Sequence, residues 1–192
     1  REDGGTPGYL QAIRAALAVL LKEHMGIEHI LCREEALKNI FLEKLCLHPQ
    51  IEVLEAGQSN RLGIISFYSL QRHHNLIVQL LNDRFGIQSR GGCSCAGTYG
   101  HILLNVKREQ SQHITEMINH GDLSEKPGWV RISLHPTMTE EEVTTIAESV
   151  HTVLDNYGRW QQDYIFEPKT GEFHHRTWKK SADDLRSDFR VW

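Results

Sequence analysis

The stretch around which the chain is organised is rich in glycine and cysteine and reads Arg90-Gly91-Gly92-Cys93-Ser94-Cys95-Ala96-Gly97. We predict that the short apolar run before it, residues 85–89, is a strand that leaves a helix. Two adjacent glycines allow a tight turn or the close approach of a ligand. Two thiols near the fixed cation of Arg90 form a setting in which a thiolate can be stabilised. A plain connection that carries two ordinary cysteines is the alternative, and this segment alone does not decide between them.

The composition is that of a globular protein with a real core. The chain has 192 residues, 40% hydrophobic and 24% charged, which suits one domain or one and a half. The formal charge of -4 gives no basic footprint for nucleic acid, and no apolar run has the length of a membrane span. Residues 1–5 are not a signal peptide, and four cysteines are too few for a disulfide scaffold, so we expect a cytoplasmic protein. Because position 1 is Arg1, we expect a processed chain or a piece of a longer one.

Apolar spacing predicts several helices and strands on both sides of the central stretch. Thr6 and Pro7 resemble the cap and the first position of a helix whose apolar residues recur at helical spacing. Thr139 and Glu142 form a capping box before the longest apolar stripe, which we expect to end at Gly158. The remaining predictions are helices over residues 28–45 and 76–85, strands over 51–55, 62–70 and 129–134, a turn at 126–128, and a hairpin around 168–171.

These elements predict an α/β fold, with a small mixed or antiparallel sheet and helices packed on one face. The strand at 129–134 alternates cleanly, so Val130 and Ile132 share one face while Arg131 points from the other. An arginine on a strand face is commonly solvated, although it can also bind a ligand. The segment 101–122 stays open between strand and helix in its first part and is weakly helical in its second.

Two further signals concern ligands. Glycines and a hydroxyl at the helix start, Gly4-Gly5-Thr6, have the donors of a phosphate site. Cys93, Cys95 and His101 have the types of ligand that zinc prefers, without a second pair at the usual spacing. A non-catalytic interaction or zinc-binding module is therefore the alternative to an enzyme.

In their order along the chain, three segments resemble the class V aminotransferases. These pyridoxal-phosphate enzymes of fold type I include the cysteine desulfurases. The segments are 4–7, 90–97 and 130–143, and the resemblance spans about residues 1 to 157. It implies the C-terminal small domain of a homodimeric enzyme that acts on an amino acid. The Schiff-base lysine of such an enzyme belongs to a preceding large domain, and no His-Lys pair of the expected kind occurs here.

The resemblance also implies roles for individual residues. Thr6, with Gly5 beside it, resembles the threonine that reaches the cofactor phosphate of the partner subunit. Arg131 resembles the arginine that binds the substrate carboxylate, and Arg90 resembles the arginine upstream of the reactive cysteine. Cys95 resembles the desulfurase cysteine that takes up sulfur, although the second thiol of Cys93 and the departure over 101–125 leave a transaminase or lyase open. No metal is expected in this reading.

The same resemblance divides the chain into three parts. Residues 1–26 would form an inter-domain helix, 27–158 the small domain, and 159–192 a hairpin and tail that only some larger members carry. The isolated chain would lack activity.

Overall fold

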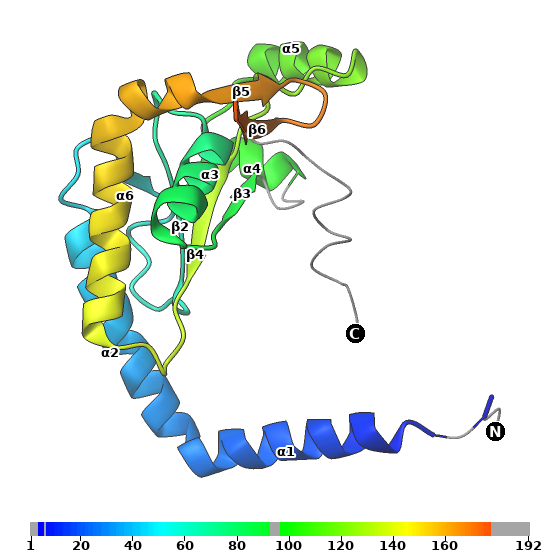
Figure 1. Ribbon diagram of the computed structural model, residues 1–192, viewed down its shortest axis with the longest axis vertical. Coiled ribbons are helices and arrows are strands. Elements are labelled where there is room, and N and C mark those ends of the chain that lie inside the picture. Colours follow the sequence, from blue (N-terminus) through cyan, green and yellow to red (C-terminus); the bar gives the residue numbers. More distant parts are fainter. Residues whose placement is uncertain (1–3, 6, 93–96, 178–192) are drawn as a thin grey trace.

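The computed structural model describes residues 4–5, 7–92 and 97–177 (Figure 1). Helices and strands alternate irregularly along the chain. They are α1 (Tyr9–Met25), α2 (Ile27–Leu45), β1 (Glu52–Val53), β2 (Ile64–Tyr68), α3 (His74–Phe85), β3 (Arg90–Gly92), α4 (Gly97–Leu103), α5 (Arg108–Asn119), β4 (Trp129–Ser133), α6 (Glu140–Trp160), the 3-10 turn η1 (Gln161–Asp163), β5 (Tyr164–Glu167) and β6 (Glu172–His175).

The main sheet has four strands in the order β1-β2-β4-β3, and all three pairings are antiparallel. Val130 of β4 is paired with Phe67 on one side and Gly91 on the other. This sheet confirms the expected α/β fold with a small antiparallel sheet. It also makes β4 an inner strand, so Arg131 does not lie on a sheet edge.

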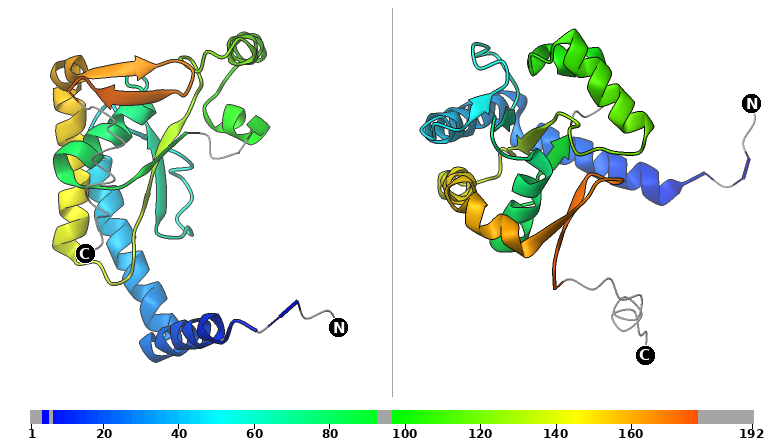
Figure 2. Two further views of the ribbon diagram at one scale, coloured as in Figure 1. Left: turned by 45° about the vertical axis from the view of Figure 1, so that its right-hand side comes forward. Right: turned by 90° about the horizontal axis from the view of Figure 1, so that it is seen from above.

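Helices α2, α3 and α6 cover one face of this sheet, as Figure 1 and the two views of Figure 2 show. The core lies between them and the inward residues of β2 and β4, where Ile65, Phe67 and Val130 are fully buried. The predicted stripe of α6 supplies much of the rest, with Val143, Ala147, Val150 and Val153 at 0% exposure. Apolar burial on this scale is the main stabilising term of the fold.

Helix α6 begins as the sequence predicts. The Thr139 hydroxyl accepts a hydrogen bond from the Glu142 N–H, and the Glu142 carboxylate accepts one from the Thr139 N–H, at 3.1 and 2.7 Å. The predicted end at Gly158 is wrong, because the helix continues to Trp160. A single glycine in a helix costs only about 1 kcal/mol, and packing of Tyr157 and Trp160 against the core offsets that cost.

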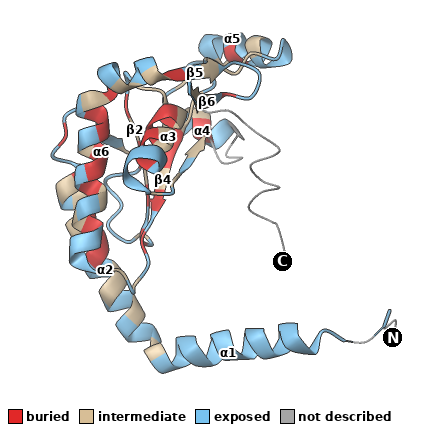
Figure 3. Cartoon of the chain, in the orientation of Figure 1, coloured by how far each residue is buried: buried red, intermediate tan, exposed pale blue. Residues whose placement is uncertain are grey.

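Helix α1 differs from the expectation at its start and is bare along its length. It begins at Tyr9 with Gly8 at the cap, so the proposed cap at Thr6 is wrong, and Thr6 itself lies outside the described residues. No residue of α1 is buried, and Figure 3 shows the helix in the pale blue of exposed residues up to its last residue. Gly26, with φ 79°, is the only residue between α1 and α2.

In the middle of the chain, two local predictions need correction, and one segment that the sequence left open can be assigned. Residues 85–89 are not a strand, since Phe85 ends α3 and Gly86 takes the left-handed conformation that caps it. The strand follows this run directly, as β3 over Arg90–Gly92. The open segment 101–122 is helical in both parts, and the turn expected at 126–128 lies earlier, where the Lys126 N–H donates to the Leu123 carbonyl.

A buried cation in α2 escaped the sequence analysis. Lys38 is 1% exposed, and its ammonium binds the Glu35 carboxylate and donates to the Ser59 carbonyl at 2.8 Å. These contacts satisfy a charge that would otherwise be costly to bury, and they tie the loop after β1 to α2.

The predicted hairpin is confirmed as β5 and β6, which form a separate two-stranded sheet. It is fastened to α3 at both ends. The Tyr164 hydroxyl donates to Asp83 at 2.8 Å, and the Asn75 side-chain amide donates to the Gly171 carbonyl at 2.6 Å. The hairpin therefore belongs to the same packed body as the main sheet.

Candidate functional site

The sheet places two of the predicted site residues directly opposite each other. Arg90 of β3 is the register partner of Arg131 of β4. Side chains that are directly opposite in an antiparallel pair project to the same face, with Cβ atoms about 4.5–5.5 Å apart. The two guanidinium groups thus share the face that does not carry the buried Val130 and Ile132.

Ser66 of β2 completes this row, since it is paired with Arg131 from the other side. Arg131 is half-buried between its neighbours, whereas Arg90 is exposed. Within the described ranges, neither guanidinium has an ion pair or a side-chain hydrogen bond. Like charges directly across a strand pair are unfavourable, so the arrangement favours an anion between or above them. A guanidinium presents a planar pair of donors that matches a carboxylate.

Strand β3, which carries Arg90, is held in place by α3. A Cβ on Gly91 would collide with the Asn75 side chain and approach Val78 Cγ2 to 3.3 Å. Only glycine therefore allows this strand to lie so close to the helix. The close approach fixes the position of Arg90 relative to α3, and it explains Gly91 as a packing residue, whereas Gly92 has a φ of 103° that favours glycine.

His74 lies beneath the same strand. A Cβ on Gly128 would stand 2.5 Å from His74 Nε2 and 2.9 Å from the Gly92 Cα, so these three residues are packed tightly. Burial, and then the nearby charges of His73 and Lys126, lower the pKa of His74 to about 3. His74 is thus a neutral packing residue at ordinary pH, and the His73–His74 pair is stacked with ring centroids 4.6 Å apart.

The predicted reactive cysteines cannot be placed. Cys93 and Cys95 lie outside the described residues, directly after Gly92 and before α4. Their attachment to β3 means that the chain leaves the sheet next to Arg90. The prediction of a reactive thiol stays a prediction.

Only one of the two residues predicted to bind phosphate can be placed. Gly5 is exposed, whereas Thr6 lies outside the described residues. Gly5 precedes α1, at the far end of the arm that this helix forms away from the sheet (Figures 1 and 2). In a single copy of the chain, Gly5 is therefore not brought together with Arg90 and Arg131.

The zinc alternative gains no support from geometry. Among the residues that the structure describes, no three His, Cys, Asp or Glu side chains are grouped as metal ligands would be. The His101 Nδ1 lies 3.1 Å from the Ser111 hydroxyl. The other two proposed zinc ligands, Cys93 and Cys95, lie outside the described residues.

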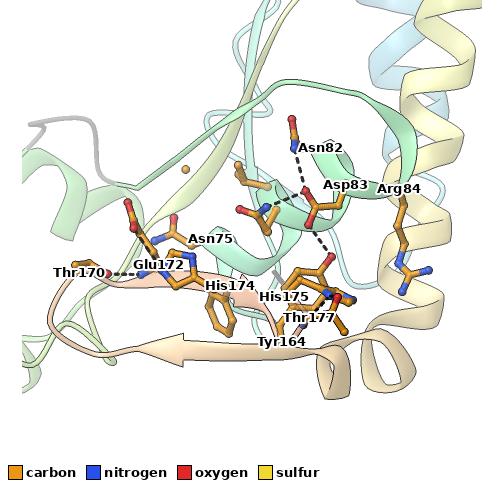
Figure 4. Close-up of a pocket in the computed structure, with 14 residues that line it drawn as sticks. Asn75, Asn82, Asp83, Arg84, Tyr164, Thr170, Glu172, His174, His175 and Thr177 are labelled. Carbon is orange, nitrogen blue, oxygen red and sulfur yellow. Dashed lines mark hydrogen bonds and ion pairs between the residues drawn. The ribbon is translucent and has the colours of Figure 1, made fainter. Parts of the chain in front are cut away.

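One site was missed entirely by the sequence analysis. An open groove of about 1160 Å³ lies between α3 and β6 and reaches Gly91 (Figure 4). Its walls come from segments far apart in the chain, and no motif links them. Paired polar residues at helical spacing, such as Asn75, Gln79 and Asn82, were the one signal available.

The described residues include no helix with the length and hydropathy needed to cross a membrane.

Comparison with known proteins identifies the class. Residues 1–146 match the family model of the class V aminotransferases, and the chain belongs to this family. The family consists of pyridoxal-phosphate enzymes. The expected resemblance is thus confirmed, while the division at residues 26 and 158 stays a prediction.

Two solved structures illustrate the shared fold. The apo cysteine desulfurase of Thermococcus onnurineus NA1 has 22% sequence identity and a TM-score of 0.58, over 80% of this chain and 33% of that one. The cysteine desulfurase CsdA of Escherichia coli has 18% identity and a TM-score of 0.52, over 80% of this chain and 32% of that one. The chain therefore spans about a third of the length of these enzymes. No curated protein matches it.

Proposed function

We propose that this chain is the C-terminal part of a pyridoxal-phosphate-dependent aminotransferase or cysteine desulfurase-like enzyme that acts on an amino acid. The observation that supports this most is the Arg90–Arg131 pair, which lies without a partner among the described residues in a chain of this family. Arg131 binds the α-carboxylate in this proposal, and Arg90 stands beside it at the start of the cysteine loop.

The described residues fit the cofactor as a supporting half-site. Gly5 is exposed, and α1 has no side-chain cap, so the first turn of α1 offers N–H groups to a phosphate apart from that of Tyr9, which donates to the Pro7 carbonyl at 2.9 Å. In the proposal, Gly5 and Thr6 bind that phosphate across a homodimer, since α1 extends away from the arginine pair of its own chain. The bound cofactor would supply the electron sink for amino-acid chemistry.

This chain's own residues then position the substrate and handle sulfur. The paired guanidinium groups orient the carboxylate, and the strand held by α3 sets their height. Cys95 or Cys93, at the end of that strand, accepts sulfur if the enzyme is a desulfurase. The cytoplasm is the compartment that suits free thiols.

The cofactor-binding large domain is the partner that the proposal requires. The apolar stripe of α1 supports such a partner, because Leu10, Leu17 and Leu20 are 59–74% exposed. A patch of this kind is unusual on a free surface. The proposal fails if the coding sequence upstream of Arg1 does not specify a lysine-bearing domain of this family.

A substitution tests the role of Arg131 in the complete enzyme. Arg131→Ala should weaken amino-acid binding by about 2–5 kcal/mol, because a hydrogen-bonded charge pair is lost, while cofactor absorbance persists. Arg131→Lys keeps the charge but loses the fork and should recover only part of the affinity. Arg159→Ala, on the exposed end of α6, is the matched control. Unchanged affinity in Arg131→Ala would show that Arg131 is a surface residue.

A further inference from the structure

The groove of Figure 4 has a strand edge as one of its walls. The Arg176 N–H donates to the Asp163 carbonyl at 2.8 Å, so residues 163 and 176 form a hydrogen-bonded pair. Bonded and non-bonded pairs alternate along an antiparallel ladder. The pairs 165–174 and 167–172 are therefore bonded, whereas 164–175 and 166–173 are not.

This alternation leaves a row of main-chain groups on the outer edge of β6. The N–H and C=O groups of Phe173 and His175 point away from β5. Within the described part of the chain, these N–H groups donate no hydrogen bond to another element, and these carbonyls accept none from one. Both residues line the groove. Unpaired edges of this kind are templates for another strand.

The opposite wall is suited to a polypeptide backbone. Helix α3 contributes the half-buried Val78 and the amide side chains of Asn75, Gln79 and Asn82. Amides both donate and accept, as a peptide main chain requires. Two bonds between the hairpin and α3 brace the groove, one from Asn75 to Gly171 and one from Tyr164 to Asp83, the latter drawn in Figure 4. The site is therefore preformed.

The charge of the groove selects the partner. Glu172 is exposed beside the edge, and its nearest cationic candidate is His174 at 3.7 Å, on the same strand. Asp83 receives hydrogen bonds only from neutral groups, Gln79, Asn82 and Tyr164. The one arginine of the lining, Arg84, is occupied by Asp163 at 3.1 Å and by the Trp160 ring. The lining is thus net acidic.

We propose that this groove binds an extended basic peptide segment of a partner protein, which adds a third strand to the hairpin along the free edge of β6. Main-chain bonds to Phe173 and His175 supply affinity, and Glu172 selects a lysine or arginine side chain. The hairpin wall of the groove lies beyond residue 146, where the family match ends, whereas the α3 wall and Gly91 lie within the match. A partner bound there would touch Gly91 and hence the strand that carries Arg90.

The test uses the full chain and the peptide acetyl-Lys-Val-Lys-Val-Lys-amide. Titration is followed by amide NMR shifts and hydrogen exchange at Phe173 and His175. Binding should slow exchange of both amides, and methylation of alternate peptide nitrogens should weaken affinity about tenfold or more, because main-chain bonds are lost. An acetyl-Glu-Val-Glu-Val-Glu-amide peptide should bind at least about fivefold more weakly.

Two variants sharpen the test. Glu172→Lys should weaken the basic peptide and strengthen the acidic one, whereas Glu52→Lys makes the same charge change on edge strand β1 and should do neither. The proposal is overturned if no binding is detected, if methylation has no effect, or if the shifts centre elsewhere. It is also overturned if both amides are already protected in the free chain, since the edge would then be occupied without a partner.

Discussion

Helices α1 and α6 both carry an apolar stripe, but only the stripe of α6 is buried. Seven residues of α6 are buried, from Val143 to Tyr157, while none is buried in α1. Both patterns are what a helix against a core would show. The difference shows that an apolar stripe predicts a packing partner for the helix, but not whether that partner lies in the same folded unit. For α6 the partners are α2 and α3, and for α1 we propose the large domain.

Truncation of matched leucines should show the largest contrast between these helices. Leu154→Ala in α6 should lower the free energy of unfolding by about 2–5 kcal/mol, because it leaves a cavity at a site that is 1% exposed. Leu17→Ala in α1, which is 60% exposed, should change it by less than about 0.5 kcal/mol. Urea unfolding of both variants measures this contrast. Equal losses would mean that α1 already has a partner in solution.

Low pH should lower the free energy of unfolding of the packed core through His74, whereas helix α1 should make no such contribution. The pKa of His74 is about 3 when folded and ordinary when unfolded, so below about pH 6.5 the unfolded chain takes up the proton first. Stability should therefore be constant above that pH and fall by about 2 kcal/mol between pH 7 and pH 5.

His74→Gln should remove the part of this pH dependence that comes from His74. Unfolding free energies measured at several pH values test this. His24→Gln, on exposed α1, is the control and should leave the slope in place. A slope that survives in His74→Gln would assign the effect to other groups.

The helix starts offer the smallest contrast. Thr139→Ala removes the capping box of α6 and should cost about 1 kcal/mol. Gly8→Ala at the start of α1 removes no side-chain cap and should cause no comparable loss. Thr144→Ala, inside α6, controls for the loss of a threonine. Thermal unfolding of the three variants is sufficient, and a Thr139→Ala protein as stable as the parent would show that the cap is redundant with packing.

What the sequence predicted well was local. The capping box at Thr139, the α6 stripe and the hairpin turn each depend on residues within a few positions of one another. The family resemblance came from ordered motifs and did not need a fold. Alternation in 129–134 placed Arg131 on the correct face.

What it missed depends on contacts between distant segments. Strand β3 exists because Arg90, Gly91 and Gly92 pair with β4 and Gly91 approaches α3, whereas the apolar run before them looked more like a strand. From the sequence, Lys38 would be taken for a surface residue, because the loop carbonyls that accept its hydrogen bonds come from a distant segment after β1. The groove needs α3 and β6 together, and the opposition of Arg90 and Arg131 required the strand order.

Gly26 is the single residue that joins α1 to α2, so its backbone angles set the direction of α1. Helix α1 has 17 residues and is about 25 Å long, so a rotation of about 10° at this one glycine would move its N-terminal end, where we propose the phosphate site, by about 4 Å. A positive φ of 79° is strained for any other residue type, which makes the angle of this lever sensitive to one position. If the proposed homodimer forms, the distance over which one copy reaches toward the other therefore depends on the backbone of Gly26, which belongs to neither proposed site.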